Sequence, residues 1–250
     1  MTFKPGFIIP VYRHGKTVGS LVEKISPLGI PVILVDDGND DETRRRLAEA
    51  VAAWPLITPV RLEKNRGKGA AIRAGLERAH EMGLTHVLQV DADGQHDISR
   101  VGFFLEQSRL HPEAAVCSWP EYDDSVPLSR KNGRKISNAW VHILTLSGDS
   151  VDALCGFRVY PVEALRNIMH RRYIDPRMGV DAELLVRLYW KRIPVLFFPV
   201  KVTYPPEGIS NFHAVWGNVR ISLTFTRLFF GMLIRLPVLI GRRLKGRRRS

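Results

Sequence analysis

The first half of the chain alternates short apolar runs with amphipathic stretches. The apolar runs have the length of β-strands and read FIIPV, PVILV, VRL, HVLQV and AAVCSW, with helical patterns between them near 15–26, 41–53, 67–82 and 97–110. This alternation is typical of βαβ units. It predicts an α/β fold with a mostly parallel central sheet flanked by helices, in which ligands bind beyond the carboxyl ends of the strands.

Length and composition fit one large domain. The chain has 250 residues, of which 45% are hydrophobic, enough for a substantial core. We expect this domain to span residues 1–214, followed by an amphipathic, basic segment over 215–250. The two cysteines imply no disulfide framework and suit a reducing cytoplasm. The N-terminal apolar run is broken by Pro10, so it predicts a strand and not a secretory signal.

Two carboxylates follow the fourth apolar run. Asp91 and Asp93 are two residues apart just past the end of HVLQV, so they leave the sheet on the same side. Together with the amide of Gln95 they offer oxygen ligands for Mg²⁺ or Mn²⁺ bound along with substrate phosphates. A polar turn gives the same pattern, so this motif needs support from the other loops.

The loops after the first three runs are also on the expected ligand side. Pro10 and Tyr12 follow the first run, and Asp36 and Asp37 follow the second. A carboxylate in that position can accept hydrogen bonds from a nucleotide base or ribose, or can simply shape a turn. The third loop reads NRGKGAA, in which glycines let the backbone approach a ligand and Lys68 can neutralise a phosphate.

Part of the second loop has a structural explanation. Asn39 is followed three residues later by Glu42, which resembles a capping box at the start of a helix.

Taken in order, the loops IPVY, VDDGNDDET, NRGKGAA and VDADGQH resemble glycosyltransferase family 2, which has the GT-A fold. Downstream, CGFRVY resembles the SGFRLY segment of the family, and GVDAELLVRLYWKRIPVLFFPV resembles its acidic helix and following strand. The resemblance covers about residues 5–205 and is closest to the polyprenyl-phosphate branch. It implies inverting transfer from a UDP- or GDP-sugar. It also implies a metal at Asp91, Asp93 and Gln95, and donor contacts from Pro10, Tyr12, Asp36, Asp37, Lys68 and Asp91.

A basic stretch precedes an apolar helix that we expect to begin near Asn138. Its cations are Arg130, Lys131, Arg134 and Lys135. The resembling branch uses basic residues here for a lipid phosphate, so these four are the candidate acceptor ligands. A solvated basic helix start is the alternative.

Asp181 and Glu183 are the candidate catalytic carboxylates. Residues two apart on a helix point in different directions, so at most one can face the catalytic centre. That residue would be the general base for a hydroxyl acceptor. A phosphate acceptor needs no base, and the acid would then orient substrate. A carboxylate favoured by the helix dipole is the alternative.

The C-terminal segment is apolar and basic. The net charge of the chain is +12, and six of the last nine residues are Arg or Lys. On a helical wheel, Arg220, Arg227, Arg235 and Arg242 share an arc of about 80°. Their opposite face carries Phe225, Phe229, Met232, Leu233, Leu236 and Ile240. The pattern predicts an interfacial helix, kinked at Pro237, on an anionic membrane surface. A core-packing helix with a basic outer face is the alternative.

The sequence therefore predicts an inverting glycosyltransferase that moves a sugar to a lipid-linked acceptor, either a polyprenyl phosphate or a glycolipid. We expect it to lie in the cytoplasm, bound peripherally to the inner face of the cell membrane. A glycosyltransferase acting on a hydroxyl acceptor is a second hypothesis. A non-enzymatic basic protein that binds membranes or nucleic acid is a third, but it leaves the acidic loops unexplained, so nucleic acid is a disfavoured partner.

Overall fold

A single sheet organises the chain. The computed structural model describes residues 2–122, 126, 128–171, 173–203 and 214–247, and within them lies a seven-stranded sheet. Its order is β3-β2-β1-β4-β6-β5-β7, and only β6 runs antiparallel to its neighbours. The strands are β1 (Pro5–Val11), β2 (Val32–Asp37), β3 (Ile57–Leu62), β4 (His86–Gln89), β5 (Ala115–Tyr122), β6 (Arg158–Pro161) and β7 (Val195–Val202).

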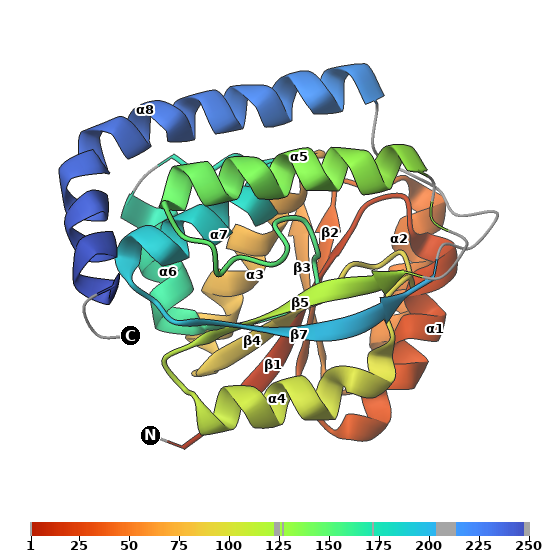
Figure 1. Ribbon diagram of the computed structural model, residues 1–250. Helices are drawn as coiled ribbons and strands as arrows, with labels where there is room; N and C mark the ends of the chain where they lie inside the picture. Colours follow the sequence, from red (N-terminus) through yellow and green to blue (C-terminus); the bar gives the residue numbers. More distant parts are fainter. Residues whose placement is uncertain (1, 123–125, 127, 172, 204–213, 248–250) are drawn as a thin grey trace.

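Helices cover both faces of the sheet (Figure 1). One core lies under α1 (Gly15–Ile25), α2 (Asp41–Ala53) and α4 (Val101–Leu110), the last preceded by the short helix η2 (Ile98–Arg100). A second core lies under α3 (Lys68–Glu81), α6 (Val162–Arg171) and α7 (Val180–Lys191). A 3-10 turn, η1 (Ser26–Leu28), follows α1. The predicted α/β fold with a mostly parallel sheet is confirmed.

Sequence periodicity explains the first helices. In α1 the buried residues Val18, Leu21, Val22 and Ile25 follow the spacing of one helix face. The predicted capping box in the second loop is wrong. Asp40 caps α2 by accepting a hydrogen bond from the Thr43 amide at 2.9 Å. Asn39 instead donates through Nδ2 to the Val11 carbonyl, so it ties the first two ligand-side loops together.

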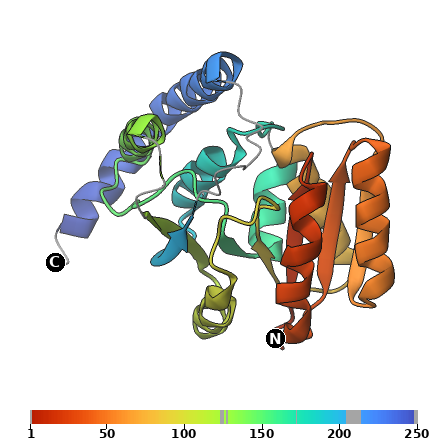
Figure 2. The same cartoon turned by 90° about the vertical axis from the view of Figure 1, so that its right-hand side faces the viewer.

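A third layer stands outside this sandwich. The helices α5 (Leu128–Thr145) and α8 (Ala214–Arg247) lie side by side and pack on α7, sharing a core that includes Val141, Trp190 and Leu228 (Figures 1 and 2). The start of α5 differs from the expected one near Asn138. The helix begins at Leu128, because the basic stretch is itself helical; within it Lys135 is exposed and Arg134 bonds to Asp152.

The orientation of α8 differs from the predicted one at three of the four arginines, whereas the fourth, Arg220, is exposed. Arg227 pairs with Glu183 of α7, the Arg235 guanidinium lies 4.4 Å from the centre of the Trp190 ring, and Arg242 donates to the Trp190 carbonyl. These arginines therefore face the protein. Of the residues predicted opposite them, Phe225 and Met232 are buried with Leu228 and Leu239, whereas Leu233 and Ile240 are exposed. Partners on α7 decide this orientation, and the wheel alone contains no information about them.

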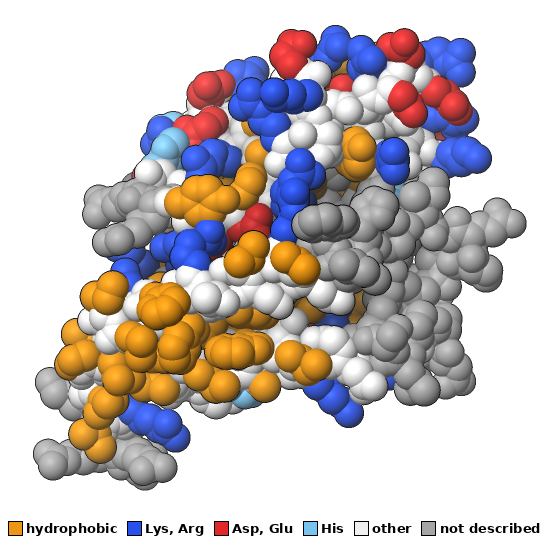
Figure 3. Space-filling view, turned by 90° about the horizontal axis from the view of Figure 1, so that it is seen from above, with side chains coloured by type: hydrophobic (Ala, Val, Ile, Leu, Met, Phe, Trp, Pro, Cys, Tyr) orange, Lys and Arg blue, Asp and Glu red, His pale blue; other side chains and the backbone are white. Residues whose placement is uncertain are grey.

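The outward side of α8 is apolar. Leu223, Phe230 and Ile234 are 63%, 61% and 81% exposed, and Figure 3 shows apolar side chains gathered on this face beside Lys and Arg side chains. By length and composition alone, residues Gly217–Leu244 could cross a membrane, with a mean hydropathy of 1.7 over the most apolar window and 28% of that window buried. The helix bends in its C-terminal part, where it contains Pro237 (Figure 1).

Replacing a buried α8 residue tests whether this helix is part of the folded domain. Leu228 is 1% exposed, so Leu228→Ala should lower the free energy of unfolding by about 2–5 kcal/mol, measured by urea denaturation. The matched variant Leu223→Ala removes the same atoms from a site that is 63% exposed and should change stability by less than about 0.5 kcal/mol. Equal small effects would mean that α8 does not pack on α5 and α7 in solution.

Candidate active site

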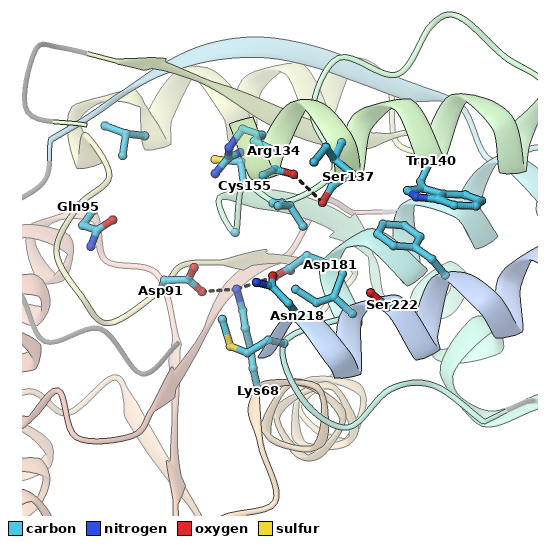
Figure 4. Close-up of a pocket in the computed structure, with 18 of the residues that line it drawn as sticks. Lys68, Asp91, Gln95, Arg134, Ser137, Trp140, Cys155, Asp181, Asn218 and Ser222 are labelled. Carbon is cyan, nitrogen blue, oxygen red and sulfur yellow. Dashed lines mark hydrogen bonds and ion pairs between the residues drawn. The ribbon is translucent and has the colours of Figure 1, made fainter. Parts of the chain in front are cut away.

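The loop after β4 opens into a cavity of about 780 Å³. Its floor carries Lys68, Asp91, Asp93 and Asp181, and its outer wall is formed by α5 and α8 (Figure 4). Ile136, Trp140, Ile221 and Phe225 give this wall apolar side chains, and Arg134, Ser137, Asn218, Ser222 and Thr226 give it polar ones. The cavity thus joins a charged floor to a wall of mixed apolar and polar side chains on α5 and α8.

Lys68 connects two of the candidate carboxylates. Its Nζ lies 2.7 Å from Asp91 Oδ1 and 2.7 Å from Asp181 Oδ2 (Figure 4). Burial lowers the pKa of Lys68, but the carboxylates of Asp181 and Asp91 outweigh it and hold that pKa above its usual value. Burial likewise raises the pKa of Asp91, and the ammonium of Lys68 more than offsets it. Lys68 and Asp91 are therefore both charged at neutral pH.

Asp181 and Glu183 have different surroundings. Asp181 lines the cavity and accepts a second hydrogen bond, from Gln89 Nε2 at 2.9 Å. Glu183 is fully buried away from the cavity lining, where it pairs with Arg187 and Arg227 and accepts from the Asp175 amide. Glu183 is therefore placed to hold α7 against α8, and the catalytic role suggested for it from the sequence does not fit its position.

The candidate donor residues on the first two loops lie beside this cavity and not in its lining. Asp36 Oδ1 accepts from the Asn39 amide at 2.9 Å. Asp37 accepts from the amides of Arg66 and Gly67 at 2.8 and 2.9 Å, so it fixes the loop that carries Lys68. Burial raises the pKa of Asp37, and these two amides only partly oppose that effect. Pro10 and Tyr12 lie at the carboxyl end of β1, next to these loops.

A glycine allows the second and third loops to approach. Gly38 has φ of 69°, a conformation that L residues rarely adopt, and a Cβ there would overlap the backbone of Lys64 and Asn65. The spacing between the Asp37 loop and the Lys68 loop therefore depends on this residue.

One of the four candidate acceptor cations reaches the cavity. Arg134 lines it and donates from Nη1 to both carboxylate oxygens of Asp152 at 2.6 Å. Lys131 is half-buried and Lys135 is exposed, and neither is in the lining. The side chain of Arg130 lies outside the described part of the chain.

The face of α5 that carries Arg134 is bonded to the loop before β6. Asn138 and His142 follow Arg134 at four-residue spacing and bond to Ala153 and to the Ser150 carbonyl. The loop bonded in this way leads to Cys155 and Gly156 beside Asp91. The sequence did not predict these contacts, because the four-residue spacing on α5 does not show which loop packs against the helix.

Cys155 and His96 form a second polar contact in the cavity lining. Cys155 Sγ lies 3.4 Å from His96 Nε2. Burial lowers the pKa of His96, but the neighbouring thiol and the carboxylates raise it to about 9. His96 therefore adds a basic group to the cavity lining, next to Asp91 and Asp93.

The donor atoms at Asp91, Asp93 and Gln95 are all oxygens, the type that Mg²⁺ and Mn²⁺ prefer. Asp91 and Asp93 line the cavity, and Asp93 Oδ1 accepts from the Gln95 amide at 3.1 Å. Among the described residues, no group of three or more His, Cys, Asp or Glu side chains is already gathered for a metal. The residues fit a divalent ion in chemistry, with the remaining ligands coming from substrate and water.

Residues 7–169 match the model of glycosyl transferase family 2. The chain belongs to this family. It is 24% identical over 244 residues to a UDP-N-acetylglucosamine–dolichyl-phosphate N-acetylglucosaminyltransferase of Methanococcus voltae, covering 91% of this chain and 96% of that protein. It is 30% identical to a dolichyl-phosphate beta-glucosyltransferase of Trichomonas vaginalis over 72% of this chain and 60% of the longer relative.

Solved structures support the fold. Glucosyl-3-phosphoglycerate synthase from Mycobacterium tuberculosis, in complex with Mn²⁺, uridine diphosphate and glucosyl-3-phosphoglycerate, has a TM-score of 0.68 to this chain at 17% identity. The match covers 90% of this chain and 80% of the synthase. At this identity the likeness establishes the GT-A fold of this glycosyltransferase and not its substrates.

Gly156 provides a test of the site. A Cβ at this position would overlap the carboxylate of Asp91, so Gly156→Ala should displace that group and lower kcat/KM for transfer by about 10²-fold. Gly148→Ala is the matched control, because nothing lies within 4 Å of its added methyl group. Wild-type kinetics for Gly156→Ala would show that the position of Asp91 is unimportant for the reaction.

Proposed function

We propose that this glycosyltransferase transfers a sugar from a nucleotide-diphosphate sugar to a polyprenyl-phosphate acceptor at the cytoplasmic face of the membrane. The main support is the cavity, whose lining combines a charged floor, the cation Arg134 of α5 and apolar side chains of α5 and α8 such as Trp140 and Phe225. An acceptor with a phosphate head and a hydrocarbon chain matches both parts. The dolichyl-phosphate acceptors in the names of the two relatives support the same class.

The state of Asp181 favours a phosphate over a hydroxyl acceptor. A hydroxyl must lose a proton as it attacks, which requires a free base. Both oxygens of Asp181 are already engaged, one by Lys68 and the other by Gln89. A phosphate is anionic at neutral pH and attacks without a base. We assign Asp181 the role of orienting Lys68.

The proposed reaction forms a bond between an acceptor phosphate oxygen and the anomeric carbon while the bond from that carbon to the donor diphosphate breaks. Attack from the side opposite the leaving group inverts the anomeric centre. Lys68 lies where it can neutralise charge on the departing diphosphate, and Arg134 can hold the acceptor phosphate. A divalent ion held by Asp91, Asp93 and Gln95 would act as a Lewis acid toward the diphosphate when bound.

Incubation of the full chain with UDP-glucose or UDP-N-acetylglucosamine, Mn²⁺ and vesicles that contain polyprenyl phosphate tests this function. Mass spectrometry should detect a glycosylated lipid phosphate. Vesicles with the corresponding free polyprenol should give no product. Product on the polyprenol alone would contradict a phosphate acceptor and favour a hydroxyl one.

The same assay tests the acceptor cation. Arg134→Gln removes a charge-assisted hydrogen bond to the phosphate, so kcat/KM for the lipid should fall by about 10–100-fold, with little change in the KM for the donor. Lys135→Gln is the matched control, because Lys135 is exposed on the same helix. Equal effects of the two variants would mean that general surface charge, and not a specific contact, explains acceptor binding.

We further propose that α5 and α8 dock on the bilayer through their exposed apolar residues. Ile136, Ile143, Phe230 and Ile234 belong to this face, while three arginines of α8 bond to the protein. Apolar burial should therefore supply most of the affinity, and high salt should weaken binding only partly. The sequence pattern predicted that apolar burial and attraction to an anionic surface act together, and the inward orientation of these three arginines shifts the expected balance toward apolar burial.

Flotation with liposomes checks the docking face. Replacing both Phe230 and Ile234 by Glu should greatly reduce the fraction of protein that floats, because two charges would enter the interface. Leu110→Glu introduces a charge at an exposed apolar residue at the end of α4, far from this face, and should leave flotation unchanged. Full flotation of the double variant would exclude this face as the membrane contact.

A further inference from the structure

Lys68 is paired with a carboxylate that a bound divalent ion would also need. Its ammonium is 2.7 Å from Asp91, the first candidate metal ligand. We infer that Lys68 couples the binding of the divalent ion to the binding of the donor, by competing with the ion for Asp91 until a diphosphate accepts its ammonium. This inference rests on the proposed metal site and adds to it an interaction between two ligands.

The contacts of Asp91 make the competition direct. The described structure gives its carboxylate an ion pair with Lys68, whose side chain is 11% exposed. A divalent ion on the same carboxylate would bring a second positive charge close to the ammonium, inside a cavity where water screens poorly. Binding of the ion by itself must therefore weaken the pair or displace the ammonium.

Asp181 would keep Lys68 in the cavity when a divalent ion binds to Asp91. Asp181 is fixed at Oδ1 by Gln89, and its carbonyl accepts from Arg158 at 2.8 Å. The flexible stem of lysine can turn about this anchor, since its three donor hydrogens are not restricted to one geometry. The ammonium can then reach a phosphate oxygen that lies near Asp91.

A donor diphosphate changes the sign of the interaction. Its oxygens accept hydrogen bonds from Lys68 and also bind the metal, so the repulsion between the two cations is replaced by attraction to a shared anion. Each ligand should therefore raise the affinity of the other by the same factor, in the range of about 5–150-fold usual for coupled sites. Lys68 therefore keeps the affinity for the metal low until the donor is bound.

Mn²⁺ binding measured by calorimetry or electron paramagnetic resonance, with and without UDP, tests this coupling without any turnover. Lys68→Met should bind Mn²⁺ alone at least about fivefold more tightly than wild type, and UDP should then enhance Mn²⁺ binding by a smaller factor than it does in wild type. The variant with both Lys68→Met and Asp181→Asn removes one positive and one negative charge. Tighter Mn²⁺ binding by this double variant would therefore show the release of Asp91 and not a change in net charge. The double variant also avoids leaving Asp181 as a buried carboxylate without its cation.

Two controls separate this inference from the proposed metal site. Arg73→Met removes a positive charge from the same helix outside the cavity lining and should not alter the coupling. Asp93→Ala should abolish Mn²⁺ binding; retained binding would refute the metal site. If Asp93→Ala loses Mn²⁺ but the charge-matched double variant binds Mn²⁺ alone no more tightly than wild type, the site stands and the role of Lys68 as a competitor is wrong.

Discussion

The candidate site depends on one buried cation shared by two carboxylates. Lys68 begins α3, Asp91 follows β4 and Asp181 lies in the first turn of α7, so their ion pairs hold three distant segments at one point. Charges placed at low exposure are tolerated only with partners, and removal of one partner leaves the others uncompensated. Asp37 accepts a hydrogen bond from the Gly67 amide and so holds the loop of Lys68. Gln89 and Arg158 donate hydrogen bonds to Asp181 and hold it in place.

Helix α7, which carries Asp181, also joins the site to the outer layer. Glu183 is two residues beyond Asp181 in α7, and it pairs with Arg227 of α8. Asp175, which precedes α7, accepts from Thr224 of α8 at 2.7 Å. The helix that we propose for membrane contact is therefore bonded to the helix that orients Lys68. A displacement of α8 on a bilayer would therefore also displace α7, because these contacts between charged and polar groups have a defined geometry.

Sequence reasoning was most successful where one segment contains its own information. The strands and helices up to residue 110 follow from hydrophobic period, and the positions of Lys68 and Asp91 follow from loops at the carboxyl ends of strands. Asp181 was a candidate because its helix resembles the acidic helix of the family. Asp40 replaced Asn39 as the cap of α2, because the Asn39 side chain found a partner on β1. Such a choice depends on tertiary contacts.

The outer layer could not be predicted in the same way. A helical wheel shows that the arginines of α8 share an arc, but whether that arc faces water or protein depends on Glu183 and Trp190, which are far away in the sequence. The partnership of Arg134 with Asp152 is equally non-local. Residues that acquire their roles from distant partners carry no pattern of their own.

The charge balance of the cavity explains why a metal and a phosphate acceptor suit each other here. The lining has the carboxylates Asp91, Asp93 and Asp181, against the cations Lys68 and Arg134 and the imidazole of His96. The carboxylate of Asp152 also offsets the charge of Arg134. Such a site has little positive charge to spare for two anionic substrates. A divalent ion would supply it on the donor side. On the acceptor side, Arg134 bonds to Asp152 through Nη1, so an acceptor phosphate would meet the other donors of its guanidinium. Neutralisation of Asp181 by Lys68 keeps a third carboxylate from repelling either anion.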